Sequence, residues 1–358
     1  MNIDNMGRYR DKLSKLITAL TFDDVLLIPK YSDLKLSEID VSTRITRRLK
    51  LKIPIISSPM DTVTGERTVL ALGKIGGLGV LPRNLDLDAT LKIVDRALEE
   101  KVPVGVAVGP FDDDRVEKAV ERGASIIVID TAHGYSKNVI EATRRFKKEY
   151  GIDIMSGNVV TGEAAEALIE AGADSLRVGI GPGHACTTRE IAGIGVPQLT
   201  AVAWVADVAS EYGVSVVADG GVEKPADIVK ALAVGADAVM LGYLLAGTDE
   251  APGDIIVIGG KRYKKYRGMG SRGALASGSV RYGDFKKVPE GIEGFVEYRG
   301  PLREVVDFLI GGLKQGMGYV GARNLAELRE KAEFVCITSQ GLQESRPRGL
   351  IIGESEWI

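Results

Sequence analysis

Residues 161–180, TGEAAEALIEAGADSLRVGI, contain one complete structural unit of this chain. Apolar residues recur at the three- and four-residue spacing of an amphipathic helix over residues 161–172, and the apolar run Ser175–Ile180 follows as a short strand. Gly172 suits the left-handed position that ends a helix, and Ala173 leads directly toward the strand. A helix followed at once by a buried strand is typical of a parallel sheet.

The same unit recurs along the chain. Gly123-Ala124 and Gly235-Ala236 join a predicted helix to a predicted strand in the way that Gly172-Ala173 does. The predicted strands are Pro54–Met60, Gly77–Pro82, Val104–Gly109, Ile126–Ala132, Asp153–Val159, Ser175–Ile180, Ser215–Gly221 and Ala238–Tyr243. Eight strands with intervening helices favour a closed barrel over an open doubly wound sheet. We therefore predict an α/β protein, a (β/α)8 TIM barrel with a flap insertion after strand eight.

Several segments lie outside the predicted strands and their helices. Residues 1–50 form an N-terminal segment that we expect to pack under or beside the barrel, and residues 249–300 form a Gly-rich, basic insertion with little periodicity. Long irregular insertions in compact domains are usually functional, and this one would lie over the C-terminal mouth of the barrel. A last helix, Pro301–Gly316, completes the barrel before a tail at residues 317–358. We expect residues 1–358 to form a single domain.

The composition excludes several classes of protein. The chain has 358 residues, of which 45% are hydrophobic and 27% charged, so extensive disorder is ruled out. A net charge of −3 argues against a basic nucleic-acid-binding surface. No apolar run approaches the roughly 20 residues of a membrane helix, and the first residues are too charged for a signal peptide. We expect a cytoplasmic protein that acts on a small molecule, with no nucleic-acid or membrane partner.

The C-terminal ends of the strands hold the candidate catalytic residues, because barrel enzymes build their active sites there. In residues 179–189, GIGPGHACTTR, three glycines and a proline let the backbone approach a ligand closely. Cys186 follows on the same loop and is a candidate nucleophile. A lone cysteine is more often a small packing residue, but the position of Cys186 and the hydroxyls of Thr187 and Thr188 favour catalysis. Cys336, in an apolar run, keeps the packing interpretation.

The ends of strands seven and eight are candidate phosphate-binding segments. Barrels commonly bind phosphate there through backbone N–H groups, and Gly220, Gly221 and Gly242 match that chemistry. Asp219 is a candidate acceptor for ribose hydroxyls, although the alternative is a helix cap beside a tight Gly-Gly turn. The two histidines, at positions 133 and 184, are too far apart in the sequence to indicate a metal pair.

Several long motifs occur in a characteristic order. They include LTFDDVLLIP, SSPMDTVT, DTAHGYS, SGNVVTGE, VGIGPGHACTTR, VVADGG, ADAVMLG, RYKKYRGMGS, VPEGIEG and GGLKQGMGYVGA. Over nearly the whole chain these motifs resemble the IMP dehydrogenase/GMP reductase family. The resemblance implies that Cys186 attacks C2 of a purine nucleotide while C2 exchanges hydride with a nicotinamide cofactor. The dehydrogenase uses NAD and hydrolyses the resulting thioimidate, converting IMP to XMP, whereas the reductase releases ammonia from GMP and forms IMP.

The resemblance also implies roles for individual residues. It implies proton handling by Thr188 and Glu290, and a mobile pair, Arg281 and Tyr282, whose arginine helps to activate the hydrolytic water. The implied substrate-binding residues are Ser58, Asn158, Arg177, His184, Asp219, Gly220, Gly221, Gly242, Tyr243, Tyr266, Met269 and Gly270, and the implied cofactor-binding residues are Asp130 and Gly179. The implied potassium ligands are Gly181, Gly183 and Cys186, with Glu344, Ser345 and Arg346 from a neighbouring subunit, which implies a homotetramer.

The flap spacing and three departures from the family pattern bear on the expected activity. Arg281-Tyr282 favours the dehydrogenase, but nine positions separate Arg281 from Glu290, a spacing nearer to the reductase. His184 and Tyr243 stand where the family usually has small or hydroxyl-bearing phosphate-binding residues, so a catalytically weak nucleotide-binding paralogue is a further hypothesis. The paired regulatory modules of the CBS type that many dehydrogenases carry between strands two and three are missing, because residues 79–109 run straight through. An IMP dehydrogenase without these modules is our leading hypothesis.

Overall fold

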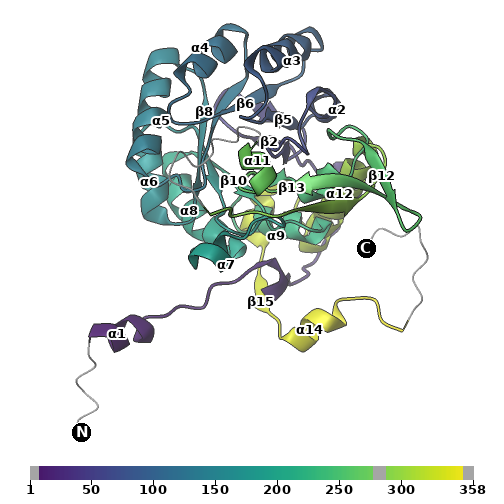
Figure 1. Ribbon diagram of the computed structural model, residues 1–358. Helices are drawn as coiled ribbons and strands as arrows, with labels where there is room; N and C mark the ends of the chain where they lie inside the picture. The colour runs from purple at the N-terminus through teal and green to yellow at the C-terminus, as the bar shows by residue number, and fades with distance from the viewer. Residues whose placement is uncertain (1–7, 277–287, 350–358) are drawn as a thin grey trace.

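A closed barrel of parallel strands forms the centre of the computed structural model, which describes residues 8–276 and 288–349. The strand order around the barrel is β4-β5-β6-β7-β8-β9-β10-β11, with β11 pairing back to β4 (Figure 1). The strands are β4 Ile55–Ser57, β5 Leu78–Leu81, β6 Val104–Val108, β7 Ile126–Asp130, β8 Ile154–Val159, β9 Ser175–Val178, β10 Ser215–Asp219 and β11 Ala238–Leu241. The predicted (β/α)8 TIM barrel is therefore confirmed.

Seven of the eight strands end one to three residues earlier than predicted. Ser58 to Met60, for example, continue the chain of β4 but turn away from the sheet, since the N–H of Met60 bonds the carbonyl of Ser58. In these seven strands the last residues of the predicted strand no longer pair with the neighbouring strand and instead begin the βα loop. The apolar pattern extends into these loops, which is why the sequence alone overestimates the strand lengths.

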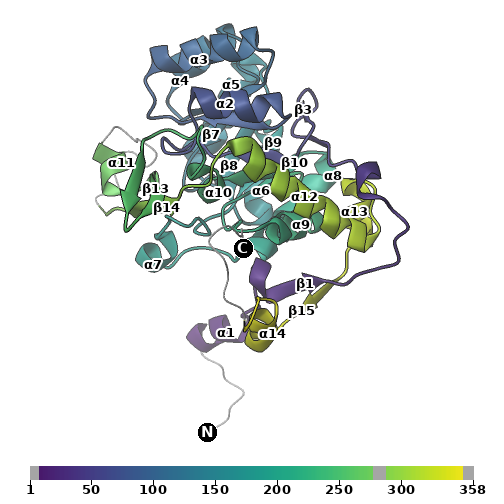
Figure 2. The same ribbon diagram turned by 90° about the vertical axis from the view of Figure 1, so that its right-hand side faces the viewer.

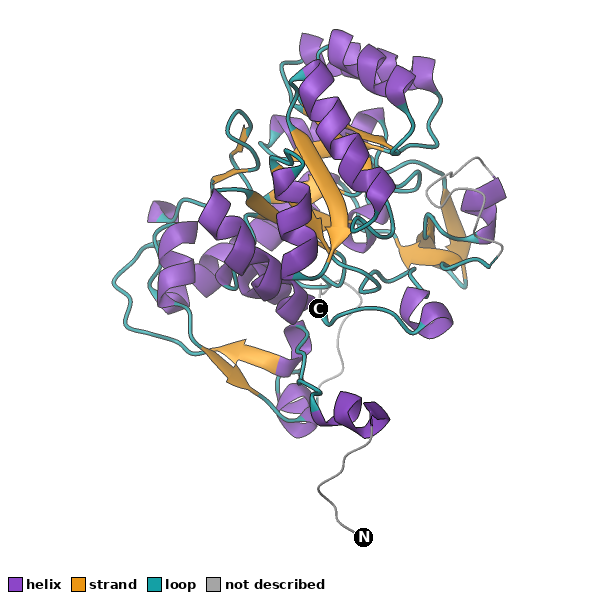
Figure 3. Cartoon of the chain, turned by 90° about the vertical axis from the view of Figure 1, so that its left-hand side faces the viewer, coloured by secondary structure: helices purple, strands orange, loops and turns teal. Residues whose placement is uncertain are grey.

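Helices surround the barrel on its outer side (Figure 3). They are α2 Glu66–Lys74, α3 Leu87–Glu99, α4 Asp113–Glu121, α5 Lys137–Tyr150, α6 Gly162–Glu170, α8 Gln198–Tyr212, α9 Pro225–Ala233 and α12 Leu302–Val320. Two short helices, α7 Thr188–Ala192 and α10 Tyr243–Ala246, lie in the loops after β9 and β11. Helix α5 shows why these segments are helical: its buried residues, Val139, Ala142, Thr143 and Phe146, have the spacing of one helix face, and Gly151 ends it in the left-handed conformation.

Helix α12 closes the ring of helices by packing against α9. A side chain at Gly316 would lie 2.7 Å from Val229, so this glycine permits the close approach of the two helices. The helix ends at Val320, four residues beyond the predicted Gly316, because the first left-handed glycine that can stop it is Gly321.

The N-terminal segment closes the other end of the barrel. Strands β2 Thr43–Arg44 and β3 Lys50–Leu51 form a hairpin whose fully buried Ile45 and Leu51 pack into the barrel interior. Their partners inside the barrel include Ile56, Val80, Val128, Met155, Val217 and Met240. This apolar plug leaves the C-terminal end of the barrel as the end available for a ligand.

The two chain ends form a small module below the barrel (Figure 2). Strand β1, Val25–Leu27, pairs antiparallel with β15, Phe334–Cys336, and α14 follows β15. The remaining elements of these two segments are helices α1 Arg8–Ser14, α13 Leu325–Lys331 and α14 Ser339–Glu344 and the 3-10 helices Phe22–Asp24 and Leu36–Glu38. The predicted tail thus contains regular structure that joins it to the N-terminal segment.

The insertion after β11 contains a small sheet that its sequence pattern does not show. Strands β12 Ile255–Ile258, β13 Lys261–Arg267 and β14 Glu293–Glu297 form an antiparallel sheet in that order, and helix α11, Arg272–Ala276, follows β13 (Figure 1). Lys264 and Tyr266 are the buried side chains of β13; Lys264 is 2% exposed and donates through Nζ to the carbonyls of Thr248 and Ala251. A buried lysine hides the alternation of apolar and polar residues by which a strand is normally predicted.

The connection between β5 and β6 contains only α3 and short loops. This agrees with the expectation that no regulatory module is inserted there. Among residues 8–276 and 288–349, no helix has the length and apolarity needed to cross a membrane.

Candidate active site

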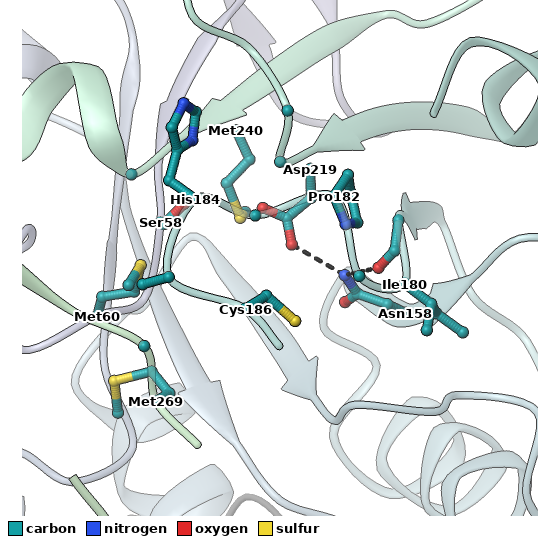
Figure 4. A pocket seen from close by; sticks show the side chains of 18 of the residues that line it. Ser58, Met60, Asn158, Ile180, Pro182, His184, Cys186, Asp219, Met240 and Met269 are labelled. Carbon is teal, nitrogen blue, oxygen red and sulfur yellow. Dashed lines mark hydrogen bonds between the residues drawn. The ribbon is translucent and has the colours of Figure 1, made fainter. Parts of the chain in front are cut away.

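A pocket lies at the C-terminal ends of the barrel strands and encloses about 900 Å³, part of it open to solvent. Loops after β4, β7, β9, β10 and β11 line it, together with Asn158 of β8, Tyr266 of β13 and residues that follow β13. Of the residues predicted as catalytic or substrate-binding, the pocket is lined by Ser58, Asn158, Arg177, His184, Cys186, Thr188, Asp219, Gly220, Gly221, Gly242, Tyr243, Tyr266, Met269, Gly270 and Glu290. Figure 4 shows several of these side chains around Cys186.

Cys186 begins a chain of hydrogen bonds that leads to a carboxylate. Its Sγ donates to Thr188 Oγ1 over 3.2 Å, and Thr188 Oγ1 donates to Glu290 Oε2 over 2.9 Å. Thr188 lies at the start of α7, whereas Glu290 comes from the insertion, 102 residues further along the chain. A nucleophile linked through a hydroxyl to a carboxylate is an arrangement that can move a proton away from the thiol.

Backbone contacts hold the insertion against the Cys186 loop. The N–H of Ile292 donates to the carbonyl of Ala185 over 3.0 Å, and Cys186 forms an isolated antiparallel bridge with Gly291. A side chain at Gly268 would come within 2.5 Å of the Ala185 carbonyl, so this contact requires glycine. The position of Glu290 relative to Cys186 is therefore set by main-chain packing.

Below Cys186, four consecutive strands contribute a buried polar network. Asp219 Oδ2, at the end of β10, accepts from Asn158 Nδ2 and from Arg177 Nε, each over 2.9 Å (Figure 4). Arg177 is 1% exposed, and its Nη2 lies 2.7 Å from Asp130 Oδ1. Arg177 thus holds two carboxylates in place, and Asp219 is the one of the two that lines the pocket.

Two buried polar atoms of this network have no hydrogen-bond partner among the described residues. They are Asn158 Oδ1, an acceptor, and Arg177 Nη1, a donor, and both residues line the pocket. Buried polar atoms without a hydrogen bond destabilise the folded protein unless a ligand or water forms that hydrogen bond. A group that both accepts and donates, such as a carboxamide, matches this pair.

Glycines shape the end of the pocket near β10 and β11. Gly220 and Gly221 have φ values of +92° and +78°, which favour glycine, and their N–H groups belong to the turn after β10. A side chain at Gly242 would lie 3.1 Å from both Met60 Sδ and the Tyr266 hydroxyl. Burial raises the pKa of Tyr266, so its hydroxyl stays protonated as a donor. Backbone amides and one phenol can therefore face a phosphate here.

Aromatic side chains stand beside this glycine-rich end. The rings of His184 and Tyr243 are stacked with their centroids 4.1 Å apart and 8° from parallel, and His184 Nε2 lies 3.1 Å from Glu223 Oε1. Burial lowers the pKa of His184 more than the neighbouring Glu223 carboxylate raises it. The guanidinium of Arg299 lies over the Tyr243 ring, 4.9 Å from its centroid.

Some predicted site residues lie elsewhere or outside the described residues. Arg281 and Tyr282 fall within residues 277–287, which lie outside the described ranges. Asp130 lies beneath the pocket with its side chain 2% exposed, while Gly179, Gly181 and Gly183 line the pocket. The remaining predicted potassium ligands, Glu344, Ser345 and Arg346, lie at the end of α14, beside the module of the chain ends and away from the Cys186 loop (Figure 2).

Gln198 is a site residue that the sequence did not reveal. It is fully buried at the start of α8, and its Nε2 donates to the carbonyls of Val178 (2.8 Å) and Asp219 (3.1 Å). It thereby holds the ends of β9 and β10 together below the pocket. A side chain at Gly179 would meet the Asp219 carbonyl at 2.2 Å, so the same close packing requires a glycine there. No local pattern in the sequence distinguishes this glutamine from a surface residue.

Comparison with known proteins identifies the family. A family model described as the IMP dehydrogenase / GMP reductase domain matches residues 19–348. The chain belongs to this family. An inosine-5′-monophosphate dehydrogenase of Cryptosporidium parvum is 42% identical over 375 residues, covering 91% of this chain and 94% of that protein. An inosine-5′-monophosphate dehydrogenase of Aquifex aeolicus is 41% identical over 467 aligned positions, which cover 92% of this chain and 95% of that protein.

The two alignments differ in length for a structural reason. The alignment with the Aquifex aeolicus protein spans more positions than the 358 residues of this chain, so that relative carries internal residues without a counterpart here. In this chain β5 is followed by α3 and then by β6, without an inserted module.

Proposed function

We propose that this protein is an IMP dehydrogenase that oxidises IMP to XMP with NAD. The observation that carries the proposal is the hydrogen-bonded chain from Cys186 through Thr188 to Glu290 in the pocket of a barrel that belongs to this family. Relatives that are 41% and 42% identical over most of their length are named inosine-5′-monophosphate dehydrogenases. Their names support the dehydrogenase direction.

In the proposed reaction Cys186 Sγ adds to C2 of the hypoxanthine ring as the C2=N3 electron pair moves to N3, and the thiol proton passes through Thr188 to Glu290, which releases it before the hydrolysis step. Hydride then leaves C2, and bound NAD supplies the acceptor for it. The product of this step is a thioimidate between Cys186 and the purine, which water hydrolyses to XMP and the free thiol. Glu290 is placed to accept the proton of that water through the Thr188 hydroxyl, and Arg281 is proposed to assist from the flap.

The buried donor and acceptor at the base of the pocket fit the carboxamide of a nicotinamide. Arg177 Nη1 would donate to its carbonyl and Asn158 Oδ1 would accept from its amide. Asp219 would accept hydrogen bonds from the ribose hydroxyls of IMP, because it lines the pocket and its other contacts leave a carboxylate oxygen available. Asp130 would orient Arg177 from below the pocket; because its side chain is 2% exposed, the burial of Asp130 does not favour the cofactor ribose contact that the resemblance implies.

Potassium and a homotetramer are further parts of the proposal. The loop carbonyls of Gly181, Gly183 and Cys186 are hard oxygen ligands of the kind that bind such a cation. The second half of the ligand set, residues 344–346, lies on α14, so a neighbouring subunit would have to supply it. Among the described residues, no cluster of three or more His, Cys, Asp or Glu side chains forms a different metal site.

A GMP reductase is the second candidate, and the short spacing from Arg281 to Glu290 favours it. The third is a nucleotide-binding paralogue with little activity, favoured by His184 and Tyr243 beside the phosphate end. One assay separates the three: absorbance at 340 nm is followed with IMP plus NAD, and then with GMP plus NADPH. We expect absorbance to rise in the first mixture. A fall in the second mixture alone would indicate the reductase, and no change in either, with measurable IMP binding, the paralogue.

A further inference from the structure

The turn after β10 packs against two other segments of the chain. Gly221 and Val222, in this turn, line the pocket. A side chain at Gly221 would lie 3.3 Å from Cβ of Pro182, on the loop that carries the candidate nucleophile, and 3.8 Å from Cε2 of Phe22. Phe22 belongs to the N-terminal segment and is 2% exposed. The place of the turn therefore depends on where Phe22 is held.

A buried lysine of α9 holds Phe22. Lys230 is 5% exposed, and its Nζ donates to the Phe22 carbonyl over 2.8 Å. Closer to the surface, Lys224 Nζ lies 2.5 Å from Oδ1 of Asp23, the residue after Phe22. Burying an ammonium group costs free energy unless the group is paired and hydrogen-bonded, and an apolar side chain would avoid that cost. What a lysine adds at position 230 is the bond to Phe22.

A buried carboxylate, three positions before Lys230 on the same helix, holds the end of the turn. Asp227 is 2% exposed, and its Oδ2 accepts from the N–H groups of Glu223 over 2.9 Å and of Lys224 over 3.2 Å. Burial raises the pKa of Asp227 and lowers the pKa of Lys230, and the charge of each opposes the shift of the other. The two groups therefore support one another in the folded protein, one on the turn and one on Phe22.

We propose that Asp227 and Lys230 are positioning residues for the 5′-phosphate of the substrate: they fix the turn after β10 between α9 and Phe22, and so fix the backbone amides that bind the phosphate. This inference rests on the proposed use of a purine nucleotide. Neither residue is among the described residues that line the pocket, so both act through the turn. Hydrogen bonds weaken steeply with distance and misalignment, so a loosened turn weakens binding of a nucleotide more than binding of its nucleoside.

The test compares IMP with inosine, which lacks the phosphate. Equilibrium dissociation constants for both are measured by calorimetry on the full chain, and KM and kcat are measured with IMP and NAD. Lys230→Met removes the bond to Phe22, and Asp227→Leu removes the bonds to the turn. Asp227→Asn keeps an acceptor for both N–H groups, because Asp227 Oδ1 has no hydrogen-bond partner among the described residues and the amide nitrogen can take its place.

Lys147→Met is the matched control. Lys147 Nζ donates to the Ile152 carbonyl over 3.2 Å and to Asp174 Oδ2 over 2.7 Å, so it too joins a backbone carbonyl and a carboxylate. These partners precede β8 and β9 and therefore lie at the N-terminal end of the barrel, opposite the pocket. Thermal unfolding verifies that each variant is folded. Phe22→Leu, which shortens the side chain beside Gly221 and removes no charge, serves as a second variant if Lys230→Met does not fold.

We expect Lys230→Met and Asp227→Leu to raise both the dissociation constant and the KM of IMP about tenfold, which corresponds to about 1.4 kcal/mol. Inosine affinity and kcat should stay within about threefold of the wild type, since the reacting C2 atom is remote from the phosphate. Asp227→Asn should restore most of the IMP affinity, Phe22→Leu should weaken IMP selectively, and Lys147→Met should resemble the wild type.

Equal weakening of IMP and inosine would show that the pair only stabilises the fold, and would overturn the inference. Unchanged IMP affinity in the folded variants, or the same selective loss in Lys147→Met, would overturn it as well. Failure of the wild type to bind IMP would instead contradict the proposed function.

Discussion

Replacing Arg177 with methionine removes the cation that lies between two carboxylates below the pocket. Arg177 is 1% exposed, its Nε lies 2.9 Å from Asp219 Oδ2, and its Nη2 lies 2.7 Å from Asp130 Oδ1. Methionine matches the length of the aliphatic part and can fill the space. The Asp130 side chain is 2% exposed, so it would be left as a buried carboxylate facing an apolar group. Removing one partner of such a pair costs about 3–5 kcal/mol.

Asp219 adds less to this cost, because it is 16% exposed and keeps the hydrogen bond from Asn158. We therefore expect Arg177→Met to lower the free energy of unfolding by about 4 kcal/mol, measured by urea unfolding followed by circular dichroism. Adding Asp130→Asn removes the stranded charge and should recover about 1–2 kcal/mol. A loss below about 1 kcal/mol in the single variant, or a double variant no more stable than the single one, would refute the reasoning.

Four further outcomes are expected. Cys186→Ala should abolish turnover while IMP still binds, and retained turnover would contradict the covalent mechanism. Glu290→Gln should lower kcat by about 10²–10⁴ with little change in IMP affinity, because the amide cannot accept the proton that Glu290 takes up; an unchanged pH–rate profile would argue against this role. Arg281→Ala should spare the initial burst of hydride transfer but slow hydrolysis, so that covalent enzyme–nucleotide adduct accumulates; equal loss of both steps would count against its flap role. Burial raises the pKa of Asp153, but the hydrogen bonds from Arg48 and Thr46 outweigh burial and hold this pKa below its ordinary 3.8. The stability that Asp153 contributes is therefore present above that value and is lost as the pH falls through the folded pKa. Asp153→Asn should make the free energy of unfolding depend less on pH in the acid range.

The barrel could be predicted because each of its units carries the same local signals. A short buried strand, an amphipathic helix and a glycine at the helix end occur together in residues 161–180, and each signal depends on neighbours within a few positions. The three-stranded sheet of the insertion could not be predicted in this way. One of its buried residues on β13 is Lys264, whose ammonium finds carbonyl partners only when the chain around Thr248 is folded beside it.

Individual residues of the candidate site could be predicted from the sequence, but their pairing could not. Cys186 and Asp219 stand out because their strand-end positions and glycine-rich neighbours are visible in the sequence, and the structure places both in one pocket. The pairing of Arg177 with two carboxylates was not visible, although Arg177 itself was predicted as a substrate contact. It depends on Asp219 and Asp130, 42 and 47 positions away on β10 and β7, which come together only through strand order and register.

The sequence by itself determined the repeating βα units, the closure of eight strands into a barrel, and the strand-end position of the candidate nucleophile Cys186, because these follow from local periodicity and from the spacing of glycines. Tertiary structure alone decided which charges balance each other and what stands at the phosphate end. His184, Tyr243 and Arg299 lie up to 115 positions apart in the chain, and their stack exists because the insertion packs back onto the barrel mouth. Contacts of that range depend on the path of the whole chain, which no local pattern encodes.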